Sequence, residues 1–235
     1  MNQKRQVTEE EVTELYLFTR KHFVEHYDVQ SELVDHLAND IEQIWLQHPQ
    51  LPFDKARDLS FKKFGVFGFM NVVEKKQKAM HKKYWKILWR FVKEWFTLPK
   101  IISTALIFML YFSLFQVPYS LQILFGAFVV WSLYDLIRFA QNRRKSKGKK
   151  RIEKRWLLQD MIGETRGGFS FLTFVNFFNI INLLKIDFGT LPFYWLALFA
   201  ALGTLLTIVF YVSAVVLPQK ATQLLEETYP EYKMQ

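Results

Sequence analysis

Two long stretches of the chain contain no charged residue and are filled with large apolar side chains. They run from Ile101 to Tyr134 and from Phe188 to Gln219. A membrane-spanning helix needs about 20 apolar residues, because each residue rises 1.5 Å and the hydrocarbon core is roughly 30 Å thick. This part of the sequence therefore predicts four membrane-spanning helices, at about 101–117, 121–140, 168–184 and 193–217.

The first 73 residues follow another pattern, in which apolar positions recur at helical spacing among polar ones. Thr8 and Glu11 form a capping-box pattern, which predicts the start of a first helix. A second helix is predicted over 29–46, where four apolar residues share one face: Leu33, Leu37, Ile41 and Ile44.

A third helix is predicted over about 53–64. The proline-containing run 48–52 separates it from the second helix, because proline lacks a backbone donor and restricts the residue before it. Gly65 follows as its C′ residue, and another helix begins near Phe67. Residues 1–73 thus read as a small helical domain.

The next segment, 74–100, mixes basic residues with aromatic ones and leads directly into the first apolar stretch. Its pattern is typical of an amphipathic helix on a membrane surface, and a basic loop between the second and third spans carries the same charge. The residues expected to meet anionic lipid are Lys75, Lys76, Lys82, Lys83, Lys86, Arg90, Arg143, Arg144, Lys145, Lys149, Lys150 and Arg151.

These patterns predict an all-α protein with a soluble half and a membrane half. The expected parts are a cytoplasmic domain at 1–73, an interfacial helix at 74–100, a four-helix transmembrane bundle at 101–217 with a cytoplasmic loop at 141–167, and a tail at 218–235. The protein is expected in the inner membrane. Because lysine and arginine concentrate before the first span and in the long loop, both termini are expected on the cytoplasmic side. The net charge of +9 is then expected to bind anionic lipid rather than nucleic acid.

Composition narrows the chemistry further. The chain has no cysteine, which excludes disulfides and thiolate chemistry. No phosphate-binding glycine loop or nucleophile motif is found, so we expect neither catalysis nor a cofactor. The N-terminus has no apolar core of a cleavable secretory signal.

Two sets of polar residues are candidate sites. Glu32, His36 and Asp40 lie one helical turn apart on one face, which makes them weak candidates for metal ligands, although a solvated acidic face is the simpler interpretation. Five polar residues fall in or beside predicted spans, where interhelical hydrogen bonds or anchoring are expected: Asp135, Arg138, Asn176, Asn179 and Asn182.

The runs 25–43 and 53–65 resemble the HAAS-type domain, a helical signalling module that precedes membrane segments in bacterial proteins. Six positions match the pattern of that family, and Phe64 stands in place of an aliphatic residue: Glu32, His36, Leu37, Asp40, Ala56 and Gly65. The resemblance covers about the first third of the chain. It implies regulation or sensing, and a PadR-type transcriptional regulator as a cytosolic partner.

The sequence thus favours a non-catalytic regulatory or sensory membrane protein, for which a homo-oligomer is one expected assembly. The alternative is a small transporter or channel subunit that uses the polar residues of its spans. A membrane enzyme acting on lipid would need convergent polar groups, for which His81, Asp160 and Glu164 are the available residues.

Overall fold

The computed structural model describes residues 5–146, 154–165, 176, 179 and 188–234. These residues are helical or irregular and include no β-strand, so the predicted all-α class is confirmed for the described chain. The chain divides into two compact units: residues 1–83 with 154–157, and residues 84–153 with 158–235. Each unit is described by itself below.

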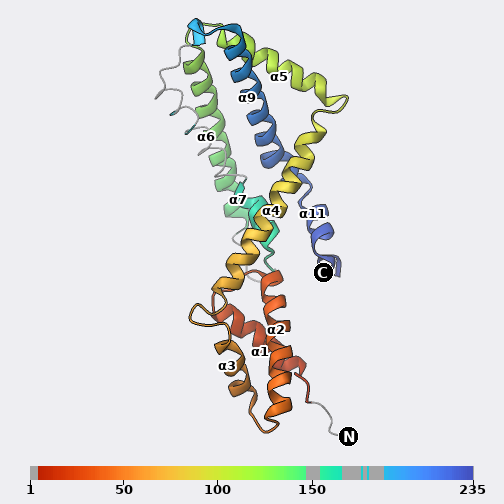
Figure 1. The fold of residues 1–235 in the computed structure, drawn as a ribbon. Helices are drawn as coiled ribbons and strands as arrows, with labels where there is room; N and C mark the ends of the chain where they lie inside the picture. The colour runs from red at the N-terminus through yellow and green to blue at the C-terminus, as the bar shows by residue number, and fades with distance from the viewer. Residues whose placement is uncertain (1–4, 147–153, 166–175, 177–178, 180–187, 235) are drawn as a thin grey trace. The chain divides into compact units, whose positions relative to one another are not determined.

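The first unit is built on helices α1 (Glu9–Lys21) and α2 (Tyr27–Gln47) (Figure 1). The predicted capping box of α1 is confirmed, because the Glu11 N–H donates to Thr8 Oγ1 at 3.2 Å and the Thr8 N–H donates to Glu11 Oε2 at 2.9 Å. All four residues of the predicted apolar stripe on α2 are buried, as that stripe forms the core of this unit: Leu33, Leu37, Ile41 and Ile44.

Helix α3 (Phe53–Lys62) follows the predicted break and ends two residues earlier than its apolar pattern indicates. Gly65 has φ +77°, so a left-handed glycine does follow the helix, but the C-cap is Lys63 and Gly65 therefore lies one position beyond the predicted C′ site. The next helix, α4 (Met70–Glu94), runs without interruption through the predicted domain boundary at 73. The reason is that 70–94 contains neither proline nor glycine, so the change from apolar to basic residues alters the helix surface and not its backbone.

The second unit contains the apolar helices α5 (Lys100–Phe115), α6 (Ser120–Ser146) and α9 (Phe193–Tyr211). A π-helical turn, η2 (Val212–Val216), and α10 (Leu217–Gln219) extend α9 without a break. Pro218 lies in this extension, and because proline has no backbone N–H it cannot make the usual hydrogen bond to the residue four positions earlier.

Helices α5 and α9 pack through small residues of α9. Ala200, Gly203 and Thr204 are buried there, and a Cβ built on Gly203 would lie 3.3 Å from the Tyr111 ring. The Tyr111 hydroxyl also forms a 2.8 Å hydrogen bond with Thr207 Oγ1. The small residues Ala200, Gly203 and Thr204 therefore allow a close helix approach.

One described helical stretch, Phe193–Gln219, is long and apolar enough to cross a membrane. Helix α5 is shorter, because its 16 residues reach only about 24 Å. The described apolar part of α6, Ser120–Trp131, is also shorter than a span, although the helix itself continues to Ser146. The third predicted span, 168–184, falls almost wholly outside the described residues. The structure thus gives one candidate span of the four that the sequence predicts.

The predicted loop 141–167 is not a simple connection. Helix α6 continues through its first residues to Ser146, and helix α7 (Leu157–Thr165) occupies its last third. Leu158, Met161 and Ile162 are buried, which an unstructured basic loop would not achieve. The C-terminal tail is likewise helical, with α11 at Ala221–Thr228 and a short turn of 3-10 helix, η3, at Pro230–Met234.

Candidate functional site

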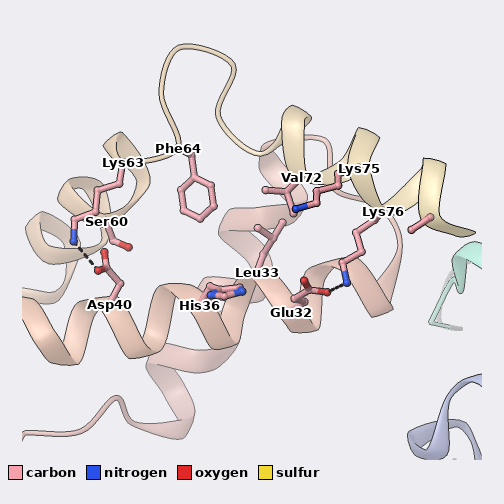
Figure 2. Close-up of a pocket in the computed structure, with 11 residues that line it drawn as sticks. Glu32, Leu33, His36, Asp40, Ser60, Lys63, Phe64, Val72, Lys75 and Lys76 are labelled. Carbon is pink, nitrogen blue, oxygen red and sulfur yellow. Dashed lines mark hydrogen bonds and ion pairs between the residues drawn. The ribbon is translucent and has the colours of Figure 1, made fainter.

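An open groove of about 600 Å³ lies in the first unit, among helices α2, α3 and α4. Figure 2 shows Phe64, Leu33 and Val72 in the middle of the groove, where they supply apolar surface, with polar side chains at both ends. The groove is lined by residues from all three helices: Glu32, Leu33, His36, Asp40, Ser60, Lys63, Phe64, Val72, Lys75, Lys76 and Ala79.

The three weak metal candidates all line this groove, but the structure pairs their carboxylates with lysines. Lys63 Nζ lies 2.6 Å from Asp40 Oδ1, and Lys76 forms an ion pair with Glu32 (Figure 2). Eight residues separate Glu32 from Asp40, so they stand about 12 Å apart along the helix axis. Among the described residues, no group of three or more potential ligands is placed to hold a metal ion. The residues therefore share a face, as predicted, without converging on one point.

One end of the groove holds two buried polar atoms without hydrogen-bond partners in the described chain. They are the Ser60 hydroxyl, on a residue only 1% exposed, and Asp40 Oδ2. A buried polar group without a partner costs about 1–3 kcal/mol, and such groups are rare in folded proteins. Asp40 Oδ2 thus has acceptor capacity, and the Ser60 hydroxyl donor and acceptor capacity, that the described chain leaves unused.

A segment distant in sequence completes the first unit. We name Lys154–Leu157 the return segment, because it packs at the N-terminal end of α2. The Tyr27 N–H donates to the Arg155 carbonyl at 2.7 Å, and the Leu157 N–H donates to Asp28 Oδ1 at 3.2 Å. Trp156 is 1% exposed and packs edge-to-face on Tyr27, with ring centroids 5.2 Å apart.

Charged contacts add to this docking. Arg155 forms an ion pair with Glu25, and Lys154 Nζ lies 4.0 Å from the centroid of the Tyr27 ring. On its other side Tyr27 stacks on Tyr16 at 5.7 Å, and burial raises the pKa of the Tyr16 hydroxyl. The loop between two predicted spans is thereby fixed to the N-terminal unit by backbone and side-chain contacts.

The predicted membrane-surface residues of α4 do not share one environment. Lys75 and Lys76 belong to the groove. Lys82, Lys83, Lys86 and Arg90 are exposed, together with Trp85 and Trp89, and Arg90 lies 3.4 Å from Glu227 of α11. A second face of α4 is buried and consists of apolar and aromatic residues: Tyr84, Leu88, Phe91 and Val92. An exposed basic and aromatic face therefore remains on α4.

The remaining predicted residues are only partly described. Arg143, Arg144 and Lys145 lie in the last turns of α6, whereas Lys149, Lys150 and Arg151 fall outside the described residues. Asp135 and Arg138 lie within α6, and their side chains are not described. Asn176 and Asn179 are helical and exposed, and Asn182 lies outside the described residues.

Sequence reasoning missed Ser60, Lys63 and Phe64 of the groove and Trp156 of the return segment. The first three sit at the end of α3, and their role depends on the packing of α3 against α2, which no single-helix pattern reports. Trp156 carried a weak signal, as it is a tryptophan directly after a run of basic residues. Of the residues named for a membrane enzyme acting on lipid, His81 belongs to the first compact unit and Asp160 to the second.

No family model matches the chain, and no curated protein and no solved structure shows significant similarity to it.

Proposed function

We propose that this chain is a multi-pass inner-membrane protein that regulates or senses, with an N-terminal helical unit that binds a cytosolic protein through the groove. The observation that carries the proposal is the groove itself. It is open, it alternates charges of both signs over apolar surface, and three helices of a capped, well-packed unit line it. Surfaces of this kind suit a peptide or helix of a partner, which supplies apolar anchors and opposite charges.

Regulation rather than passive anchoring is supported by the connections of this unit. The chain leaves it within α4 and meets it again at the return segment, which lies between the second and third predicted spans. A change in the membrane part can therefore reach this unit at two places along the chain, helix α4 and the return segment. The resemblance to HAAS-type domains supports the same proposal, with a PadR-type regulator as the partner to test first.

The transporter alternative has less support in the described spans. The hydroxyls of Thr204, Thr207 and Ser213 bond to backbone carbonyls of their own helix, at 2.8–3.0 Å. Such bonds satisfy the hydroxyls locally and leave them less suited to bind a substrate. The alternative then depends on Asp135, Arg138 and the asparagines of the third predicted span.

A photo-crosslinking amino acid tests the groove directly. We expect p-benzoylphenylalanine at His36, which lines the groove and is exposed, to form an adduct with a cytosolic protein when intact cells are irradiated. The adduct is detected as a shift on a denaturing gel and identified by mass spectrometry. The same amino acid at Asp58, which is exposed on α3 away from the groove, serves as the matched control. An adduct pattern that is equal at both positions, or absent at His36, contradicts the proposal.

Single cysteines test the membrane topology, since the chain has none of its own. We expect an impermeant maleimide to label Val117→Cys, in the exposed turn after α5, on intact spheroplasts. Gln50→Cys and Ser146→Cys should react only after permeabilisation, because positive-rich segments stay in the cytoplasm. Labelling of Ser146→Cys from outside would overturn the proposed topology.

A further inference from the structure

An exposed apolar edge on the first unit has no role in the groove or in the core. We define it by four residues, Phe23, Val66, Phe67 and Met70. Val66 is 99% exposed, Phe23 84% and Phe67 71%, so these side chains contribute almost nothing to folding. Contiguous exposed apolar residues of this size mark interaction sites.

The backbone holds two of these residues at the tip of a tight turn. Gly65 and Gly68 have φ +77° and +51°, and the Gly68 N–H donates to the Gly65 carbonyl at 3.1 Å. A Cβ on Gly68 would lie 3.0 Å from the Phe61 ring, and the positive φ would strain any other residue, so both features favour glycine there. Corner positions of such turns are usually polar, yet here they are Val66 and Phe67.

Phe23 stands out in the same way on the neighbouring loop. Its φ is +65°, which is strained for a bulky side chain and is more often found at functional positions. The two loops meet at one ring cluster, because His22 lies 4.5 Å from Phe61 and 5.8 Å from Phe69 between ring centroids. The apolar edge is therefore supported by rigid aromatic packing beneath it.

The unpaired charges closest to the apolar edge along the chain are basic. Arg20 and Lys21 end α1, and Lys62 ends α3, and all three are exposed with no ion pair within the described chain. The two carboxylates nearest along the sequence are already paired, Glu25 with Arg155 and Glu74 with Lys78. A surface with apolar tips and unpaired cations complements anionic lipid better than an acidic or neutral protein surface.

We propose that the apolar edge inserts Val66, Phe67 and Phe23 into the headgroup region of an anionic membrane surface, with Arg20, Lys21 and Lys62 on the lipid phosphates. This inference rests on the proposed function, since the spans would keep the unit close to lipid. Docking of this kind would make the N-terminal unit respond to the lipid charge of the inner leaflet, a regulation that the groove alone does not provide.

The test uses the full chain in vesicles, with an NBD fluorophore on a single cysteine. Val66→Cys changes a fully exposed side chain, so folding is not at risk. In vesicles of phosphatidylcholine and phosphatidylglycerol we expect blue-shifted NBD emission that lipids with headgroup-proximal nitroxides quench. Pure phosphatidylcholine should give a smaller shift. The matched control is Gln50→Cys, in the exposed turn between α2 and α3, which should stay in water in both vesicles.

Two further variants separate the outcomes. K21Q and K62Q should each lower the ratio of docked to undocked label about fivefold, as each removes one cation near the surface.

A third variant, Leu110→Cys, has its label at an exposed position of α5 and reports on the spans. If Leu110 is protected and Val66 behaves like Gln50, the inference is wrong and the proposed function stands. A water-exposed Leu110 label overturns both. A blue shift at Val66 without nitroxide quenching, present in detergent as well, indicates a protein contact and overturns the lipid proposal.

Discussion

Replacing Trp156 by alanine is expected to destabilise the N-terminal unit by about 3–5 kcal/mol, the usual range for a buried aromatic residue. Trp156 is almost fully buried and packs on Tyr27, and its neighbours hydrogen-bond to the first residues of α2. Its loss would leave a cavity beside Tyr27 and free the return segment. A change in the loop between two predicted spans would thus weaken a domain that begins more than a hundred residues earlier.

Pulse proteolysis of the detergent-solubilised full chain across a urea series measures this effect on the N-terminal unit. Trp89→Ala is the matched control, because Trp89 is a tryptophan 43% exposed on α4. The control should cost at most about 1 kcal/mol, since an exposed side chain leaves no cavity. Equal and small effects of the two substitutions would show that the return segment is not part of the unit.

Gly203→Leu is expected to separate α5 from α9 and to lower stability by about 1–3 kcal/mol. The glycine faces the Tyr111 ring so closely that even a Cβ would be tighter than normal packing. A leucine there must push the ring aside and strain the hydrogen bond between Tyr111 and Thr207. If both helices span a membrane, as we propose, their contact depends on close packing and not on the hydrophobic effect, so the loss of fit has no compensation.

The temperature at which solubilised protein ceases to elute as a single species on size exclusion measures this loss. We expect a decrease of about 2–10 °C for Gly203→Leu. Gly126→Leu on α6 is the control, because a Cβ on Gly126 meets no described atom within 4 Å. The control should leave that temperature unchanged or raise it slightly, as leucine favours helix more than glycine does. A similar decrease in both variants would mean that crowding at Tyr111 is not its cause.

The helical elements were largely predictable because their signals are local. The capping box of Thr8 and Glu11, the stripe from Leu33 to Ile44 and the left-handed Gly65 each depend on a few consecutive residues, and each is confirmed. The end of the predicted domain at 73 had no such signal. Helix α4 continues through it, and the compact unit extends to Lys83.

The candidate site was predicted only in part, for the same reason. Periodicity places Glu32, His36 and Asp40 on one face of α2, and they do lie together in the groove. It does not report that Lys63 and Lys76 come from other helices to neutralise the two carboxylates. Those pairs occupy the two carboxylates that the metal hypothesis needed and leave a groove with charges of both signs, on which the proposed partner binding depends.

The sequence by itself determined the all-α class, the apolar segments and the start of the first helix, since these follow from composition and spacing within single helices. Only the tertiary structure decided that the return segment completes the N-terminal unit, that α9 packs on α5 through Gly203, and that lysines line the groove. Contacts between Asp28 and Leu157 join residues 129 positions apart. Such contacts depend on how helices pack against one another, and the period of one helix carries no information about its neighbours.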